Sequence, residues 1–340
     1  MPTLAIGIDL GGTNLRAALY SGLEKAGARR SVDDRMPQPV ARHSELVGES
    51  RQPEKIAARM ARIVIELVRK SGFGDTMVPV GIGLPGLLKG PHGVMGVSPH
   101  LGWRDVPFGT IMRRALGDHW PIVVHNDANA ITYGEYAVGA GVGVDDLLAV
   151  YVGTGIGAGI IAGGRLLQGA THCAGEVGHF KVVYGDDAPL CNCGMRGCAE
   201  TFIGGTYLQA RVRRDLASGA KTEALELAGG NPAAIHTGHL DRAAARGDQY
   251  ALDLYTEIAP PVAMALGSAI NLLNPARLIL GGGVLSSAPV LRGHLVASLT
   301  IATSSVILEP CTVVEAALGD DAGLIGGALL AGAIHWEQSK

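Results

Sequence analysis

The sequence predicts an α/β protein of about two domains. Segments of strand-like character alternate with segments of helical periodicity along its 340 residues, and this alternation is typical of helices layered on a sheet. A strand pair joined by a glycine turn occurs near the N-terminus and again near the middle, which indicates two related halves. The length allows each half to bury its own core.

The first half begins with a predicted hairpin. Residues 4–9 and 15–20 are strand-like, and the turn between them carries two glycines and polar side chains. Residues 31–52 are charged and irregular, so we expect strand ends and an exposed loop there. A helix is expected between Pro53 and Gly72, because the apolar residues between them recur on one face at helical spacing.

Buried strands and a second hairpin are predicted further along the chain. Residues 78–84 and 122–124 are expected to be buried strands, with a helix over residues 128–137 behind the second. Residues 147–152 and 156–162 form the second predicted hairpin, again about a glycine turn. This hairpin is the one that repeats the first.

Composition narrows the class of function. The 28 basic and 31 acidic residues nearly balance, so we expect no nucleic-acid partner and no membrane surface. Two uncharged stretches approach membrane-span length. The first is the glycine-broken second hairpin, and the second, residues 258–276, has Pro260-Pro261 at its start and suits a buried helix. The five cysteines follow no secretory signal, which predicts a reducing, cytoplasmic location.

A cysteine-rich segment predicts a structural metal site. One imidazole and three thiolates suit four-coordinate Zn²⁺ with no open position. The alternative is a disulfide cluster or a set of unrelated residues, although Cys-x-Cys neighbours pair poorly. A closed zinc site would hold Glu176 and Glu200 at fixed positions. The candidate ligands are His179, Cys191, Cys193 and Cys198.

Two glycine turns are candidate phosphate contacts. In residues 9–14, backbone N–H groups and a threonine hydroxyl can approach phosphates, and Asp9 can face a phosphate-bound Mg²⁺ through water. Residues 153–157 repeat the device, so the two turns could hold one polyphosphate. Each turn by itself is weak support, since glycine turns join hairpins widely.

Other glycine patterns are less specific. No Gly-Lys-Ser or Gly-Lys-Thr occurs, which excludes a P-loop. The glycines of residues 81–86 include a proline and precede turn residues, which argues against a Rossmann cofactor site. Residues 281–283 follow an apolar strand and would let a flat ring lie against the backbone, or they form a simple strand-to-helix turn.

His125-Asn126-Asp127 lies at the end of a predicted buried strand, where ligands gather in α/β sheets. Asparagine donates and accepts hydrogen bonds, as sugar hydroxyls require, and a carboxylate beside it can take a hydroxyl proton. Asp127 is therefore the candidate general base. The motif by itself leaves equally open that Asp127 only caps the following helix.

Together these motifs resemble the ROK family of repressors, open reading frames and sugar kinases. The resemblance extends from Gly7 to about Gly327 and rests on separate, ordered motifs. It implies an α/β protein with the actin-like ATPase (ribonuclease H-like) fold, in which two α/β domains flank a cleft that takes ATP and sugar. The motifs are Asp9 to Thr13, Leu84-Pro85-Gly86, Asn126-Asp127-Ala128-Asn129, Glu176-Val-Gly-His179, Cys191-x-Cys193-Gly-x-x-Gly-Cys198-x-Glu200 and Leu280-Gly-Gly-Gly283.

The resemblance also implies a division of this chain and an assembly. Residues 1–125 are the expected small domain with the first phosphate loop, completed by the C-terminal helix 322–338. Residues 126–321 are the expected larger domain with the sugar motifs, the zinc site, the second phosphate loop and the adenosine loop. Members with all of these motifs are mostly ATP-dependent hexose kinases and often homodimers.

The matching residues take implied roles. Asp127 is the base that activates the sugar hydroxyl. His179 has two tasks, because one ring nitrogen ligates zinc while the other can reach the sugar. The implied sugar contacts are Gly86 through its backbone, Asn126, Asp127, Glu176, His179 and Glu200. The implied Mg-ATP contacts are Asp9, Gly11, Gly12, Thr13, Asn14, Thr154, Gly155, Gly282 and Gly283.

Substrate choice is the least specific expectation. Glucose is the expected hexose, because the Glu176, His179 and Glu200 set resembles that of glucose-phosphorylating members. Kinases for N-acetylmannosamine, fructose, allose or N-acetylglucosamine share most of this set. His100 departs from the asparagine that many members carry in a loop expected to border the sugar.

Other classes of function are weighed against the kinase. A repressor of the same family needs an N-terminal helix-turn-helix, and the phosphate loop starts at Asp9. A sugar-binding regulator that does not bind DNA is a further alternative. A chaperone or filament-forming relative of the actin fold would lack the zinc and sugar motifs.

Overall fold

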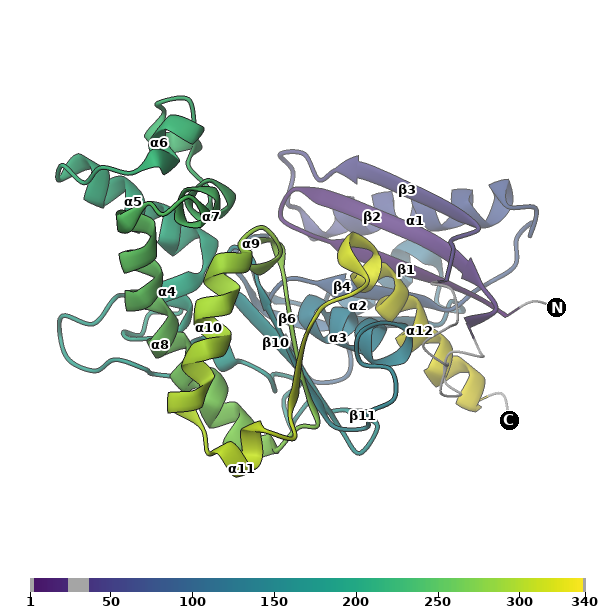
Figure 1. Ribbon diagram of the computed structural model, residues 1–340. Coiled ribbons are helices and arrows are strands. Elements are labelled where there is room, and N and C mark those ends of the chain that lie inside the picture. Colours follow the sequence, from purple (N-terminus) through teal and green to yellow (C-terminus); the bar gives the residue numbers. More distant parts are fainter. Residues whose placement is uncertain (1–2, 24–36, 339–340) are drawn as a thin grey trace. The chain divides into compact units, whose positions relative to one another are not determined.

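The computed structural model describes residues 3–23 and 37–338 of the chain (Figure 1). Contacts divide the chain into two compact units. The domain boundary expected after residue 125 stays a prediction. Unit 1 comprises Met1–Asp145, Gly159–Ala174 and Ala317–Lys340, and unit 2 comprises Asp146–Ala158 and Gly175–Ala316.

A five-stranded sheet forms the centre of unit 1, in the strand order β3-β2-β1-β4-β8. β1 pairs antiparallel with β2 and parallel with β4, and β4 pairs parallel with β8. The strands are β1 (Leu4–Leu10), β2 (Asn14–Ser21), β3 (Ala41–Leu46), β4 (Val80–Leu84) and β8 (Ile122–Asn126). A three-stranded sheet consists of β5 (Leu87–Lys89), β6 (Val94–Ser98) and β7 (Trp103–Val106).

Helices cover both faces of this sheet. Ile6 and Ile8 of β1 belong to a core cluster with residues of α1 and α2, whereas Ala5 belongs to the cluster of α12. α12 can approach β1 closely because Gly7 has no side chain, and a Cβ there would overlap the carbonyl group of Leu324. These helices are α1 (Pro53–Lys70), α2 (Phe108–Leu116), α3 (Asp127–Val138) and α12 (Ala322–Gln338), with a 3-10 turn at Gly319–Asp321.

The second five-stranded sheet has the order β11-β10-β9-β12-β13. It repeats the order of the first sheet strand for strand, and β12 pairs parallel with both β9 and β13. This shared topology agrees with the two related halves that the hairpins predicted. The strands are β9 (Leu147–Val152), β10 (Ile156–Ala162), β11 (Arg165–Leu166), β12 (Arg277–Gly281) and β13 (Thr312–Glu315).

The helices of unit 2 are mostly short, apart from α5, α8 and α10 (Figure 1). They are α4 (Glu200–Ile203), α5 (Gly205–Ala217), α6 (Glu223–Leu227), α7 (Thr237–Ala245), α8 (Gln249–Leu273), α9 (Gly283–Ser286), α10 (Pro289–Ala302) and α11 (Ser305–Leu308). Two 3-10 turns occupy Val177–His179 and Pro232–Ala234.

Two predicted boundaries are corrected by the structure. The buried helix expected to begin at Pro260-Pro261 is α8, which begins at Gln249 behind an Asp248 cap and runs through both prolines. α8 is long and apolar enough to cross a membrane, yet half of its most apolar window is buried inside the protein. Strand ends and a loop were expected in residues 31–52, but β3 is an edge strand there, with exposed side chains at every second position. Residues 31–36 lie outside the described part of the chain.

Candidate active site

Asp127 is the first residue of α3, directly after β8. The helix cap is Asn126, whose side-chain oxygen accepts a hydrogen bond from the N–H of Asn129 at 3.1 Å. The amide nitrogen of Asn126 donates to the carbonyl of Gly86 at 3.0 Å. The Asp127 carboxylate accepts from the neighbouring N–H of Ala128 at 2.8 Å. The capping role that was the alternative for Asp127 therefore belongs to Asn126.

The carboxyl group of Asp127 has a raised pKa. Burial disfavours its charged form, and the nearby Asp9 carboxylate has a smaller effect in the same direction. Together they raise the pKa of Asp127 to about 7, against hydrogen bonds that favour the charged form. A carboxylate in this range can take a hydroxyl proton at neutral pH, as a general base must.

Asp9 is the second carboxylate with a raised pKa in unit 1. Burial is the main cause, Asp320 adds to it, and Arg16 opposes it. The first turn of α12 passes close by, since a Cβ at Gly323 would lie 3.5 Å from Cγ of Asp9. The Asp9 carboxylate also raises the pKa of Asp127, and two such like charges favour a bound cation between or beside them.

The first glycine turn, residues 11–14, is held by the segment that precedes α1. The N–H of Val47 donates to the carbonyl of Thr13 at 2.8 Å. The guanidinium of Arg51 donates to the carbonyl of Gly12 at 2.8 Å. These bonds restrain the turn backbone while the side chain of Thr13 stays exposed.

His100 lies beside this turn. A Cβ at Gly12 would be 3.8 Å from Cβ of His100. The loop that carries His100 is tied to the same arginine, because the indole N–H of Trp103 donates to the carbonyl of Arg51 at 2.6 Å. The structure thus places His100 next to the candidate phosphate turn, and its contact with sugar stays a prediction.

The second glycine turn, residues 153–157, joins β9 to β10 in unit 2. The carboxylate of Glu200 accepts a hydrogen bond from the N–H of Ile156 at 2.9 Å. Gly155 permits this approach, because a Cβ there would overlap the same carboxylate. Glu200 therefore supports the turn backbone from the start of α4.

The predicted metal ligands lie together in unit 2. Their ligand atoms are all within 4.8 Å of one another. The Sγ atoms of Cys193 and Cys198 are 3.6 Å apart, and Sγ of Cys191 is 3.8 Å from Nδ1 of His179. Tetrahedral zinc places its ligand atoms about 3.5–3.8 Å apart, so the donor set and these two distances fit this metal. The cysteines are free thiols, unlike the disulfide alternative.

His179 presents its two ring nitrogens to different neighbours. Nδ1 faces Cys191, and Nε2 lies 3.7 Å from a carboxylate oxygen of Glu176. Oε1 of Glu200 lies 3.6 Å from Sγ of Cys191. The predicted sugar contacts of unit 2 are thus gathered around the metal ligands, and a metal on Nδ1 would fix the direction of Nε2.

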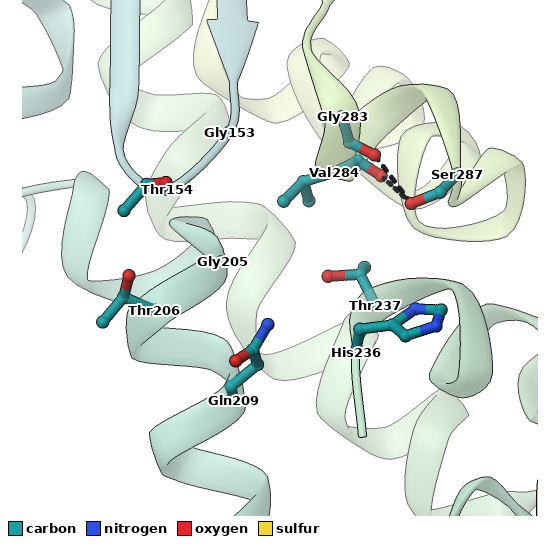
Figure 2. A pocket seen from close by; sticks show the side chains of 10 residues that line it. All are labelled: Gly153, Thr154, Gly205, Thr206, Gln209, His236, Thr237, Gly283, Val284 and Ser287. Atoms are coloured by element: carbon teal, nitrogen blue, oxygen red, sulfur yellow. Dashed lines mark hydrogen bonds between the residues drawn. The ribbon is translucent and has the colours of Figure 1, made fainter. Parts of the chain in front are cut away.

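A cavity of about 510 Å³ lies beside the second glycine turn (Figure 2). Figure 2 shows the start of α5 on one side and the starts of α7 and α9 on the other. None of the lining residues has a carboxylate, lysine or arginine side chain. They are Gly153, Thr154, Gly205, Thr206, Gln209, His236, Thr237, Gly283, Val284 and Ser287.

Two of the predicted nucleotide contacts of unit 2, Thr154 and Gly283, line this cavity. The other two, Gly155 and Gly282, are their chain neighbours. Gly282 has φ +87°, and a Cβ there would crowd the backbone of Val152. This close approach brings the start of α9 to the end of β9.

The predicted residues therefore gather in two places, one in each unit. Unit 1 holds Asp9, Gly11, Gly12, Thr13, Asn14, Gly86, Asn126 and Asp127. Unit 2 holds Thr154, Gly155, Glu176, His179, Cys191, Cys193, Cys198, Glu200, Gly282 and Gly283.

Comparison with known proteins gives the family. The sequence profile of the ROK family matches residues 5–334. This chain belongs to the ROK family. It is 32% identical to the glucokinase of Thermotoga maritima over 96% of this chain and 97% of that protein. A putative xylose repressor from a Caldicellulosiruptor species is 29% identical over 82% of this chain and 65% of that protein.

The fold of this ROK protein is similar to that of solved family members. One is the crystal structure of a ROK family glucokinase from Streptomyces griseus in complex with glucose and AMPPNP, at TM-score 0.76 and 29% identity. The alignment covers 96% of this chain and 98% of that one. The predicted family and the predicted actin-like α/β fold are confirmed.

Sequence reasoning missed most of the ROK protein's cavity wall. Thr206 had a usable signal, because Gly204-Gly205-Thr206 repeats the tripeptide of the first glycine turn. His236 and Gln209 had none, since they are far apart in the chain and meet only when α5 and α7 pack in unit 2. Arg51 of unit 1 was also missed, because it is far in the chain from Gly12 and meets it only in the folded structure.

Proposed function

We propose that this ROK protein is an ATP-dependent hexose kinase whose preferred sugar substrate is glucose. The observation that carries the proposal is Asp127, a carboxylate with a pKa of about 7 on a fixed helix start. The glucokinase of Thermotoga maritima, similar over nearly the whole of both chains, supports glucose as the hexose. The related structure with glucose and AMPPNP supports ATP as the donor.

Asp127 would act on the attacking hydroxyl of the sugar. Its carboxylate takes the proton while the hydroxyl oxygen forms a bond to the γ-phosphorus. The bond from that phosphorus to the β,γ-bridging oxygen breaks, and ADP leaves with the electron pair. Asn126 holds Gly86 by a hydrogen bond and so keeps the peptide beside the base in place.

The remaining predicted residues bind and orient the substrates. Asp9 would hold the Mg²⁺ of Mg-ATP through water, and this ion neutralises phosphate charge. The first glycine turn would hold phosphates by backbone N–H groups. Glu176, Glu200 and Nε2 of His179 would bind sugar hydroxyls. Thr154 and Gly283 would contact the nucleotide in the cavity of unit 2.

A structural zinc on the Cys-Cys-Cys-His cluster is part of this proposal. Four protein ligands fill a tetrahedron, so the metal has no place for a reacting water. It would fix the loop that carries the sugar contacts. The free thiols suit a cytoplasmic location, and a homodimer, to be checked by sedimentation, is the expected assembly.

A second candidate is a sugar-binding regulator without turnover. The likeness to a putative xylose repressor favours it. A coupled assay with a panel of hexoses, and with ATP or polyphosphate as donor, separates the two. We expect ATP-dependent turnover that is fastest with glucose. Sugar binding by calorimetry without turnover of any hexose would leave the regulator.

A further inference from the structure

Lys181 joins the two ends of the candidate metal loop. Its ammonium group donates to Sγ of Cys198 at 2.8 Å and to the carbonyl of His179 at 3.2 Å. His179 is the first of the four candidate ligands in the chain, and Cys198 is the last. A single side chain therefore contacts both segments that supply the cluster.

Backbone pairing places Lys181 opposite Cys198. The two residues form an isolated antiparallel bridge, and backbone hydrogen bonds lie on either side of it. In such a pair the two side chains lie on the same face and close together. The fold thus directs this lysine to the sulfur of Cys198. The flanking bonds run from the N–H of Val182 to the carbonyl of Gly197 and from the N–H of Ala199 to the carbonyl of Phe180, both at 2.9 Å.

The other two cysteines of the cluster receive hydrogen bonds from uncharged donors. The backbone N–H of Cys193 donates to the sulfur of Cys191, and the hydroxyl of Tyr207 donates to the same sulfur at 3.7 Å. The backbone N–H of Met195 donates to the sulfur of Cys193. Lys181 differs from these donors because it brings a positive charge, and it interacts electrostatically with all three cysteines.

A loaded metal site would have negative charge to offset. Zn²⁺ with three thiolates and a neutral imidazole sums to one negative charge. Two carboxylates add to it. Oε1 of Glu200 lies 3.6 Å from Sγ of Cys191. An oxygen of Glu176 lies 3.7 Å from Nε2 of His179. An ammonium group on a cluster sulfur offsets part of this charge, and the charge in turn strengthens its hydrogen bond.

Building on the structural zinc of the proposed function, we propose that Lys181 is a positioning residue of the metal site, which offsets the charge of the zinc–thiolate cluster and holds Cys198 in place. Its charge-assisted hydrogen bond fixes the direction of the Cys198 sulfur, as outer partners of metal ligands do. Glu200 follows Cys198 by two residues on the same segment. Lys181 would therefore act on the predicted sugar contacts through the metal loop.

Zinc affinity tests the role of the charge. Lys181→Met keeps an aliphatic stem and removes the ammonium group. We expect its Kd for Zn²⁺, measured by competition with a chromophoric chelator, to rise about tenfold. This is the lower end of the scale for outer partners, because Lys181 is only half-buried. Lys181→Arg keeps a cation with N–H donors and should recover most of the affinity. An unchanged Kd in Lys181→Met would overturn the proposal.

Co²⁺ in place of zinc gives a signature that loop stability alone would not move. Charge transfer from sulfur to cobalt needs less energy when a thiolate loses a hydrogen bond, because its electrons are then held less tightly. The charge-transfer band of Co²⁺-loaded Lys181→Met should therefore lie at longer wavelength than that of the wild type, and Lys181→Arg should stay near the wild type. Bands at one wavelength in all three proteins would show that Lys181 does not act on the sulfur.

Arg196 supplies the matched control. It lies between Cys193 and Cys198 in the chain, and its guanidinium donates to the carbonyl of Ala188 at 2.8 Å. Arg196→Met removes a cation of the same loop, so it should lower Tm slightly and leave the zinc affinity and the cobalt band close to the wild-type values. An equal loss of zinc affinity in both methionine variants would assign the effect to the charge of the loop and overturn the role of the Lys181 hydrogen bond.

Metal binding also separates this proposal from that of the kinase. If no hexose is phosphorylated and Lys181→Met still binds zinc more weakly than the wild type, the kinase function fails and the role of Lys181 stands. If glucose is phosphorylated and both proteins bind zinc equally, the role of Lys181 fails by itself. If the wild type binds no zinc, the structural metal and the role of Lys181 fail together.

Discussion

The two glycine turns occupy equivalent places in sheets of the same strand order, yet one lies near buried carboxylates and the other beside an uncharged cavity. The turn of residues 11–14 lies next to Asp9, whose carboxyl group and that of Asp127 have raised pKa values. The turn of residues 153–157 opens on a cavity with no charged lining residue. The carboxylate of Glu200 accepts a hydrogen bond from this turn's own backbone and lies near Sγ of Cys191.

Under the proposed function, this difference gives the two hairpins different tasks. Asp9 disfavours the charged form of Asp127, and such a buried carboxylate is costly unless a cation or a proton compensates it. Carboxylates with raised pKa values near the first turn therefore support a catalytic role for this part of the protein. The neutral second turn suits a nucleoside, which needs contact area and hydrogen bonds but no counter-charge.

The largest expected effect comes from removing the base. Asp127→Asn should lower kcat by about 10²-fold or more, because proton transfer in the transition state is lost. Sugar binding by calorimetry should be nearly unchanged, since the cap depends on Asn126. Turnover near the wild-type rate would show that Asp127 is not the base. The proposed difference in chemistry between the two turns would then be wrong.

The pH profile should follow the same carboxyl group. Because Asp127 must be deprotonated to act and its pKa is about 7, kcat/KM should fall about tenfold per pH unit below 7 and level off above it. The free energy of unfolding should change with pH in the opposite direction. The folded protein holds this proton up to about pH 7, whereas the unfolded chain releases it near the ordinary value of 3.8. Stability from this group is therefore lost as pH rises between these values.

The Asn variant checks the assignment of both pH effects. Asp127→Asn should lose the acidic limb of the activity profile. At pH 8 its Tm should equal or exceed that of the wild type, because the buried charge is gone. An unchanged acidic limb in the residual activity would assign the limb to another group.

The third prediction concerns the support behind the second turn. Cys193→Ser should lower zinc affinity by more than about 10–100-fold, the scale for loss of a partner outside the ligand shell, because it removes a proposed ligand itself. Tm should fall, and KM should rise for sugar and also for ATP, because Glu200 connects the cluster to the N–H of Ile156. Metal analysis, thermal unfolding and steady-state kinetics measure these effects.

A thiol outside the cluster is the control for this variant. Cys173 lies in unit 1, where its Sγ donates to the carbonyl of Leu88. Cys173→Ser should leave zinc content and both KM values unchanged. A Cys193→Ser enzyme that loses zinc but keeps both KM values would mean that packing alone holds the loop.

Arg51 tests the support of the first turn. Arg51→Met removes the guanidinium that donates to Gly12, and we expect KM for ATP to rise about tenfold, the scale for a charged hydrogen bond. Arg51→Lys should recover part of the loss. Arg62→Met, which breaks an exposed ion pair with Glu66, is the control and should leave KM unchanged. Equal KM values for both methionine variants would remove Arg51 from the site.

The smallest expected effect is at the second turn itself. Thr154→Val removes one hydroxyl from the uncharged cavity, so KM for ATP should rise about threefold, the scale for one neutral hydrogen bond. KM for glucose should change less. The reverse order of effects would separate this turn from the nucleotide.

The local features of the candidate site could be predicted from sequence. Residue spacing was enough for the candidate metal motif of Cys191 to Cys198, because its residues lie close in the chain and soft ligands favour zinc. Hairpins about glycine turns and the apolar face of α1 are also local patterns, with periods that the chain must follow. The start of α8 was misplaced because prolines usually begin a helix, and here tertiary packing carries the helix through them.

The sequence by itself determined the fold class, the ROK family, the candidate metal ligands and the identity of the candidate base. Only the tertiary structure decided that Asn126 rather than Asp127 caps α3, and that Asp127 has a pKa of about 7. It also decided that Glu200 supports the second turn and that His236 lies across a cavity from Gln209. These properties depend on burial and on contacts between distant segments, and neither is encoded in residue spacing.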